Sequence, residues 1–200
     1  MNEHYYTEEP TSKLVTEQIT FRINGTDLKL TTASGIFSRG KIDLGTKILI
    51  ENAEIKKNTK VLDLGCGYGV VGISIAKIIP DAKVVLSDVN QRATKLAKEN
   101  AKQNNVNVDV RTGDSYETVA GETFDCILLN PPQTAGRELC FKLIEQAPQH
   151  LNKQGVFYLV ARHKKGGAVL EEKMKETFSN VETVARESGF RVYKSVKQKD

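Results

Sequence analysis

The first group of residues that could carry chemistry is an acid followed by three glycines at alternate positions: Asp63, then Gly65, Gly67 and Gly69. Glycine is required where the backbone turns with positive φ or where a ligand approaches the main chain closely. Apolar runs on either side predict a buried strand before the turn and a helix after it. Such a turn presents backbone N–H groups and the positive end of a helix dipole, which indicates a site for a nucleotide-like ligand.

Two kinds of ligand compete for this turn. Gly67-x-Gly69-x-x-Gly72 has the spacing of the dinucleotide fingerprint, which alone is a weak signal. The triplet that starts at Gly65 is better placed, because the predicted strand ends immediately before it. Asp63 would repel a pyrophosphate but suits a cofactor that carries an ammonium and a sulfonium. A glycine turn with no ligand is the remaining interpretation.

The second group is Asn130-Pro131-Pro132, at the end of another apolar run. Two prolines stop a strand and stiffen the loop that follows it. The loop then offers the side-chain oxygen of Asn130 and the carbonyl of Pro131, which match the two donors of a planar –NH₂ group. Holding both hydrogens would aim the amine nitrogen at an electrophile, which is catalysis by positioning. The alternative is a proline-terminated strand whose asparagine caps the next helix.

Three further residues are candidates for the same ligand. Asp88 lies about 20 residues past the glycines, where an acid can accept both ribose hydroxyls, although it could instead cap the helix that begins near Asn90. Asp114 could accept from an adenine amino group or be an ordinary turn residue. Phe37, in a loop between two glycines, could cover the ligand or plug the core.

These residues need a scaffold that brings the ends of several strands together. After a predicted hairpin at 18–32, turning at Asn24-Gly25, the chain alternates strands and helices. The predicted strands are 61–64, 83–87, 106–111, 124–129 and 156–160, and the predicted helices begin near Leu44 (capped by Asp43), Val70, Asn90, Gly136 and Ala168. This alternation indicates a parallel sheet with helices on both faces. Two final strands, 181–185 and 190–195, are joined by four residues and must pair antiparallel.

Length and composition indicate one globular domain. Of the 200 residues, 39% are hydrophobic and 27% are charged, and no apolar run approaches a membrane span. The N-terminal residues lack the basic and apolar regions of a signal peptide. Cys66, Cys126 and Cys140 are odd in number and scattered, which predicts reduced thiols, no metal site and a cytoplasmic protein. The net charge of +4 permits a nucleic-acid partner without requiring one.

Five motifs in order resemble the methyltransferase small family, which belongs to the class I methyltransferases that use S-adenosylmethionine. They are Gly-Ile-Phe-Ser-Arg at 35–39, Asp-Leu-Gly at 43–45, the glycine turn, Ser-Asp-Val at 87–89 and Asn-Pro-Pro at 130–132. The likeness covers nearly the whole chain and, within the family, points to the RsmC-like guanine-N2 methyltransferases of small-subunit ribosomal RNA. It implies a Rossmann-like α/β fold with a seven-stranded, mostly parallel sheet whose last strand is antiparallel. It also implies that residues 1–40, with the hairpin, precede a catalytic domain at 41–200.

The resemblance also implies a role for each motif. The target amine would be held by Asn130 and Pro131, the adenine would lie near Asp114, and the Phe37 loop would lie over the cofactor. Motif and resemblance together assign the cofactor site to Phe37, Asp63, Gly65, Gly67, Gly69, Asp88, Asp114 and Asn130, and the catalytic site to Asn130, Pro131 and Pro132. We therefore expect methyl transfer to an exocyclic amine, guanine N2 of small-subunit ribosomal RNA, with free RNA or an assembling subunit as the substrate.

Two departures from the family pattern bear on this expectation. Gln133 stands where relatives that methylate amines carry an aromatic residue, so stacking on the target would fall to Phe37, Tyr68 or Tyr116. The larger relatives also carry a second, N-terminal domain, so RNA phosphates would be gripped by basic residues such as the Arg-His-Lys-Lys cluster at 162–165. A protein-glutamine methyltransferase, a DNA-adenine methyltransferase, a nicotinamide dehydrogenase and a non-catalytic RNA-binding module are the alternatives.

Overall fold

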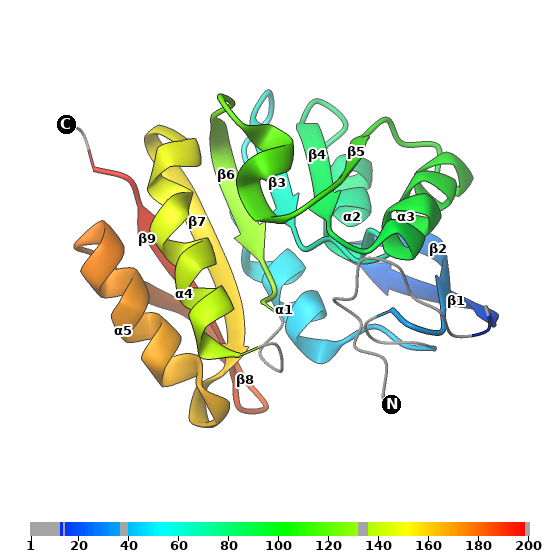
Figure 1. Cartoon of the computed structure of the whole chain (residues 1–200). Coiled ribbons are helices and arrows are strands. Elements are labelled where there is room, and N and C mark those ends of the chain that lie inside the picture. The colour runs from blue at the N-terminus through cyan, green and yellow to red at the C-terminus, as the bar shows by residue number, and fades with distance from the viewer. Residues whose placement is uncertain (1–12, 14, 37–39, 132–135, 199–200) are drawn as a thin grey trace.

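The computed structural model describes residues 13, 15–36, 40–131 and 136–198 and contains two sheets. The smaller is an antiparallel hairpin of β1 (Thr16–Ile23) and β2 (Thr26–Ala33). The larger has the strand order β5-β4-β3-β6-β7-β9-β8 (Figure 1). Its strands are β3 (Lys60–Leu64), β4 (Lys83–Asp88), β5 (Asp109–Thr112), β6 (Phe124–Leu129), β7 (Leu151–Arg162), β8 (Glu182–Glu187) and β9 (Phe190–Val196). Strands β3 to β7 are parallel and β9 runs antiparallel to both of its neighbours, so the predicted α/β sheet is confirmed.

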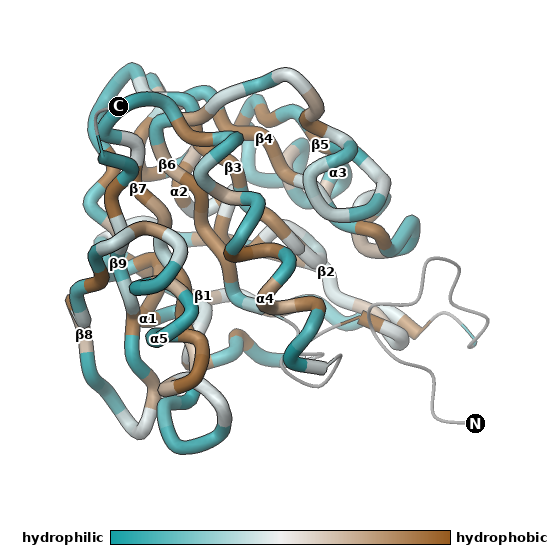
Figure 2. The backbone as a smooth tube through the Cα atoms, turned by 60° about the vertical axis from the view of Figure 1, so that its left-hand side comes forward, coloured by the Kyte–Doolittle hydropathy of each residue, from teal (hydrophilic) through white to brown (hydrophobic). Residues whose placement is uncertain are grey.

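Helices cover both faces of the large sheet. They are α1 (Leu44–Asn52), α2 (Val70–Ile78), α3 (Gln91–Gln103), α4 (Arg137–Gln146) and α5 (Gly167–Phe178), with short 3₁₀ segments η1 (Ser115–Val119), η3 (Ala147–His150) and η4 (His163–Lys165). One core joins α1, α2, α3 and the hairpin to the first face, and a second core joins η1, α4 and α5 to the other. Strands β3, β4 and β6 are hydrophobic along most of their length (Figure 2), as expected of strands covered on both faces.

The hairpin is attached to the rest of the molecule by two buried asparagines, one in α3 (Asn100) and one that caps its C-terminus (Asn104). Asn100 donates to the carbonyl of Thr31 (2.9 Å) and accepts from its N–H (2.7 Å). Asn104 makes the same pair of bonds to Lys29. These side chains satisfy the free edge of β2 as a neighbouring strand would. Asn100 also donates to the carbonyl of Tyr68 in the glycine turn (2.9 Å), so the hairpin and the turn share one anchor.

Some predicted boundaries were wrong. The strand predicted to begin at Val106 begins at Asp109, because Asn105 has a positive φ of 55° and the N–H of Val106 still bonds to the carbonyl of Ala101. Val106 and Val108 pack against the core without strand pairing, which explains their apolar character. Strand β7 is longer than predicted, since its N-terminal end pairs with β6 across an irregularity. The segment η1 was not predicted.

The cysteines agree with the sequence analysis, since Cys66, Cys126 and Cys140 are buried and free. Within the described ranges no group of His, Cys, Asp and Glu has the arrangement of a metal site. No helix in that part of the chain is long and apolar enough to cross a membrane.

Candidate active site

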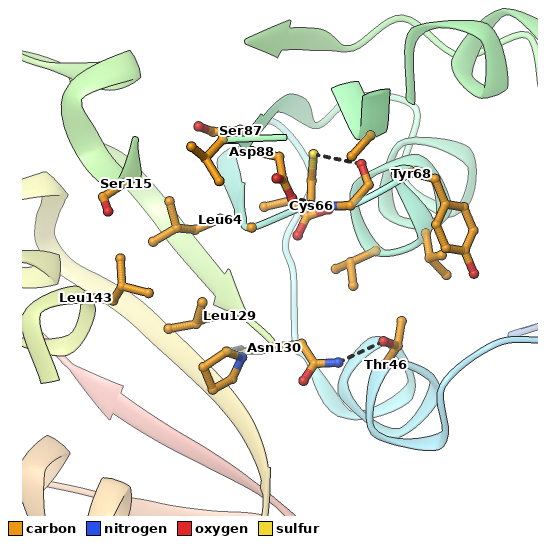
Figure 3. A pocket seen from close by; sticks show the side chains of 18 of the residues that line it. Thr46, Leu64, Cys66, Tyr68, Ser87, Asp88, Ser115, Leu129, Asn130 and Leu143 are labelled. Atoms are coloured by element: carbon orange, nitrogen blue, oxygen red, sulfur yellow. Dashed lines mark hydrogen bonds between the residues drawn. The ribbon is translucent and has the colours of Figure 1, made fainter. Parts of the chain in front are cut away.

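A pocket lies at the carboxyl ends of β3, β4, β5 and β6 (Figure 3). It brings together most of the residues that the sequence analysis selected: Asp63, Gly65, Gly67, Asp88, Asp114, Asn130 and Pro131. These residues come from segments far apart in the chain and meet because parallel strands end at a common edge. Gly69 does not line the pocket. Phe37 and Pro132, together with the departure at Gln133, lie outside the described residues.

The three glycines of the turn divide into two roles. Gly65 (φ 70°), Gly67 (φ 55°) and Gly69 (φ 94°) all have left-handed backbone, which disfavours other residues. A Cβ added at Gly65 or Gly67 would meet no atom within 4 Å, so the backbone there is open to a ligand. A Cβ at Gly69 would lie 2.6 Å from Ile73 of α2 and 3.2 Å from Leu86 of β4, so the glycine leaves room for these two side chains.

Two acids use N–H groups of the glycine turn and of α2. The Asp88 carboxylate accepts from the N–H of Gly67 (2.7 Å) and from the N–H of Asn90 (2.8 Å). Asp63 accepts from the N–H of Gly72, in the first turn of α2 (2.8 Å). In a phosphate-binding loop such N–H groups face the anion. Here these N–H groups instead bond to the carboxylates of Asp88 and Asp63. The occupied N–H groups and the two negative charges argue against a pyrophosphate and thus against the dinucleotide interpretation.

The electrostatics of the pocket favour a cation. Asp63 is only 3% exposed, and burial, with a smaller contribution from the charge of Asp88, raises its pKa from 3.8 to about 7. Burial also raises the pKa of Asp88, although its backbone hydrogen bonds oppose the shift. Among the described residues neither acid forms an ion pair with Lys, Arg or His. A positively charged ligand would therefore relieve the cost of their ionisation.

Asp88 is not the N-cap of α3. That cap is Asn90, whose side-chain oxygen accepts from the N–H of Ala93 (3.0 Å). Each Asp88 oxygen has capacity for a further hydrogen bond, which leaves the carboxylate able to accept ribose hydroxyls. Asn90 also donates to the carbonyl of Gly35 (3.1 Å), and Arg92 donates to that of Ser34 (2.8 Å). These two bonds fix the chain immediately before residues 37–39 beside the glycine turn.

The far end of the pocket is apolar, with a polar rim. Leu64, Leu129, Leu139 and Leu143 line it, and Figure 3 shows Leu143 and Leu129 on the side opposite Tyr68. The sequence analysis missed Leu139 and Leu143, which lie four residues apart and share one face of α4. Asp114 lies at the rim with its side chain 55% exposed, where it accepts from the hydroxyl of Ser115 (2.7 Å).

Asn130 lies where β6 ends, and its amide is held by α1. The Nδ2 atom donates to Thr46 Oγ1 (2.9 Å) and to Asp43 Oδ2 (3.2 Å). Figure 3 shows the amide nitrogen directed at Thr46 and the amide oxygen directed away from it. The sequence analysis gave Asp43, part of the Asp-Leu-Gly motif, no role beyond capping a helix; it does cap α1, since Oδ2 accepts from the N–H of Thr46 (2.9 Å).

Of the described aromatic candidates for stacking, neither has an exposed ring. Tyr116 is 4% exposed, stacks on His150 (centroids 4.5 Å apart) and donates to the carbonyl of Leu143. This candidate was wrong, because the ring belongs to the core. Tyr68 lines the pocket but is only 2% exposed. Burial and the nearby charge of Asp43 raise the pKa of its hydroxyl, which keeps it protonated.

Arg162 ends β7, the strand beside β6, and therefore lies on the same sheet edge as Asn130. Its guanidinium lies 4.4 Å from the centroid of the Phe190 ring. That ring in turn packs against Gly45, where an added Cβ would lie 2.7 Å from it. The contacts from Arg162 to Phe190 and from Phe190 to Gly45 therefore place the guanidinium beside the first turn of α1, and this turn binds Asn130.

The other residues of the basic cluster at 162–165 differ in how exposed they are. Lys164 and Lys165 are exposed in η4. His163 is half-buried, with Nδ1 2.9 Å from the hydroxyl of Tyr193 and 3.8 Å from Glu171. His163 is thus engaged away from the pocket, which speaks against its use as a base.

The sequence is similar to those of known proteins. The family model described as Methyltransferase small domain matches residues 27–194. YbxB of Bacillus subtilis is 36% identical over 200 residues, which cover 98% of this chain and 100% of YbxB. Ribosomal RNA small subunit methyltransferase C of Haemophilus influenzae is 33% identical over 171 residues, which cover 84% of this chain and 51% of that protein.

The fold is similar to those of solved structures. The 16S rRNA N2 methyltransferase RsmC of T. thermophilus, in complex with AdoMet and guanosine, matches with a TM-score of 0.80 at 23% identity, over 94% of this chain and 52% of that one. A methyltransferase from Pyrococcus furiosus matches with a TM-score of 0.67 at 24% identity, over 76% of this chain and 80% of that one. This chain spans about half the length (51%) of the H. influenzae relative.

Proposed function

This chain belongs to the methyltransferase small family, and from that membership we propose that it transfers a methyl group to guanine N2 of small-subunit ribosomal RNA. It is an enzyme that uses S-adenosylmethionine as the methyl donor. The H. influenzae relative supports the RNA substrate, and the N2 specificity of T. thermophilus RsmC supports the target atom. Because such RNA is made and assembled in the bacterial cytoplasm, the proposal also assigns the enzyme to that compartment.

The observation that carries the proposal is the arrangement of Asn130. Its amide nitrogen is bound by Thr46 and Asp43, so its amide oxygen is the part left to meet a substrate. Pro131 lines the same pocket. The residue after it in the sequence is also a proline, which has no N–H that could compete for the Pro131 carbonyl. Two acceptors side by side suit a group with two N–H donors, such as the exocyclic amine of guanine.

The other end of the pocket fits S-adenosylmethionine. We assign the ribose hydroxyls to Asp88 and the adenine to the space between Asp114 and the leucines of α4. The open backbone at Gly65 and Gly67 admits the ligand, and the buried carboxylate of Asp63 offsets positive charge.

The proposed mechanism uses position rather than strong acids or bases. S-adenosylmethionine supplies, when bound, a methyl group activated by a positively charged sulfur. Asn130 and Pro131 accept the two amine hydrogens, which turns the nitrogen lone pair toward the incoming methyl. The same acceptors stabilise the positive charge that develops on the nitrogen in the transition state. The surplus proton can then pass to solvent, so the chain needs no dedicated general base.

Methyl transfer from labelled S-adenosylmethionine onto unmodified 16S RNA and onto small subunits tests the proposal, with the modified nucleoside identified by mass spectrometry. We expect N2-methylguanosine. Asn130→Ala should lower kcat by at least about 100-fold, the order found when one positioned hydrogen-bonding group is lost at a reacting centre. The affinity for S-adenosylmethionine should change by less than about threefold, or roughly 0.7 kcal/mol.

Asn107→Ala is the matched control, since Asn107 is an exposed asparagine after α3 and outside the pocket. If DNA adenine or peptide glutamine became labelled and RNA did not, the proposed RNA substrate would be wrong. Near-wild-type turnover by Asn130→Ala would reduce Asn130-Pro131-Pro132 to a strand stop. If Asn130→Ala lost cofactor affinity as well as turnover, Asn130 would be a cofactor-binding residue rather than an amine-binding one.

A further inference from the structure

Asp43 has contacts that a helix cap does not require. Its Oδ2 atom accepts from the N–H of Thr46, which is the capping bond of α1. The same oxygen lies 3.5 Å from Thr46 Oγ1 and 3.2 Å from Asn130 Nδ2. The hydroxyl of Thr46, a buried residue, accepts from Asn130 Nδ2 at 2.9 Å. One turn of α1 thus binds an amide that lies 87 positions away in the sequence.

The partners determine which way the amide faces. An asparagine amide has nearly the same shape in its two orientations, so hydrogen bonds decide where O and N lie. A carboxylate can only accept, and the Thr46 hydroxyl can donate its proton to Asp43, 3.5 Å away, which leaves its oxygen to accept. Both atoms therefore select the amide nitrogen of Asn130 and turn Oδ1 away from α1, as Figure 3 shows.

We propose that Asp43 and Thr46 are positioning residues that hold the Asn130 amide with Oδ1 toward the substrate amine. The inference rests on the proposed function, in which that oxygen accepts an amine hydrogen. An amide turned the other way would present its own –NH₂ to the substrate –NH₂, and two donors repel. The pair on α1 is thus what makes the site one for a hydrogen-donating amine.

A purely structural role for Asp43 makes a different prediction. Asn and Ser cap helices about as well as Asp, whereas Ala does not, so a cap alone tolerates Asp43→Asn and Asp43→Ser. An amide at position 43 could donate toward Asn130 and favour the wrong orientation, and a serine hydroxyl lacks the charge. We therefore expect both variants to keep the wild-type melting temperature and cofactor affinity but to lose kcat by roughly 10- to 100-fold.

Thr46 offers the cleaner pair of variants. Thr46→Val keeps the shape but removes the hydroxyl, and it should lower kcat by roughly tenfold, the value of one hydrogen bond. Thr46→Ser keeps the hydroxyl and should restore most of the rate. Lys47→Ala is the matched control, because Lys47 is the next residue of the same turn and its side chain pairs with Glu51 on the surface.

The experiment combines single-turnover methylation with a measurement that needs no substrate. NMR of asparagine-labelled protein should show contacts between the Asn130 –NH₂ protons and the Thr46 methyl group, weakened in Asp43→Asn. Wild-type turnover by Thr46→Val and Asp43→Asn, while Asn130→Ala is inactive, would overturn the positioning role and leave the proposed function standing. Full activity of Asn130→Ala would instead overturn the proposed function. An –NH₂ without those contacts in wild-type protein would overturn the orientation itself.

Discussion

The buried charge of Asp63 should make cofactor affinity depend on pH near neutrality. Its pKa is raised to about 7, chiefly by burial, with Asp88 as the neighbouring negative charge. A cation in the pocket favours the ionised carboxyl, so binding should weaken as the pH falls through 7 and Asp63 takes up a proton. Asp63→Asn, which keeps the shape without the charge, should remove this dependence.

The size of the effect follows from the fraction of Asp63 that is ionised. A carboxyl with a pKa of about 7 is about 90% ionised at pH 8 and about 10% ionised at pH 6. If the ligand binds the ionised form, its apparent affinity falls by about tenfold between these two values, or roughly 1.4 kcal/mol. At pH 7, binding should release about half a proton per site.

Calorimetry with S-adenosylmethionine at pH 6, 7 and 8, in buffers of different ionisation enthalpy, measures both quantities. Asp114→Asn, at the pocket rim, is the control and should retain the wild-type pH dependence. Flat affinity from pH 6 to 8 in wild-type protein, without proton release, would refute the reasoning. Asp63 should also affect stability without ligand. Its folded pKa exceeds the unfolded one, so its contribution is greatest below about pH 4 and is lost as the pH rises through about 7.

Three further variants test other parts of the site. Asp88→Ala should weaken S-adenosylmethionine binding by roughly 10- to 100-fold in the same calorimetry, through lost hydroxyl contacts and a released Gly67 N–H; unchanged affinity would leave Asp88 a loop anchor only. Arg162→Ala with Lys164→Ala should raise the KM for RNA and flatten its salt dependence, whereas Lys57→Ala, before β3 at the opposite sheet edge, should not. Asn100→Ala should lower the free energy of unfolding by about 2–4 kcal/mol in urea titrations, since it leaves the part-buried N–H and carbonyl of Thr31 and the buried carbonyl of Tyr68 unpaired; a loss below about 1 kcal/mol would show that the hairpin contributes little.

The parts of the fold that local chemistry controls could be predicted from the sequence. The Asn24-Gly25 turn has positive φ at both residues, and Asp43 and Asn90 begin helices because their side chains accept from N–H groups of the first turn. Strand β6 ends at Leu129, directly before Asn130-Pro131, because proline cannot extend a ladder. Each signal acts between residues a few positions apart, so it can be interpreted without a tertiary structure.

The polar residues at the strand ends of the pocket could be predicted for a related reason, although Leu139 and Leu143 could not. Asp63, Asp88, Asp114 and Asn130 lie in or just past the carboxyl end of a strand, and parallel strands end at one edge, so the topology alone brings these residues together. The roles of the individual glycines could not be predicted. Gly65 and Gly69 have the same local signature, but a Cβ at Gly65 would meet no atom within 4 Å, whereas one at Gly69 would meet Ile73 of α2 and Leu86 of β4, and the Leu86 contact depends on how α2 packs against β4.

Only the tertiary structure decided how the amide of Asn130 faces and which aromatic rings are free. Tyr116 resembles a stacking residue in the sequence, yet its ring is buried and stacks on His150. Asp43 resembles an ordinary helix cap, yet the packing of α1 against the sheet places its carboxylate on Asn130. The physical reason is the same in both cases. A side chain's local signature specifies what it can bind, but contacts between residues tens of positions apart depend on how helices pack across the sheet.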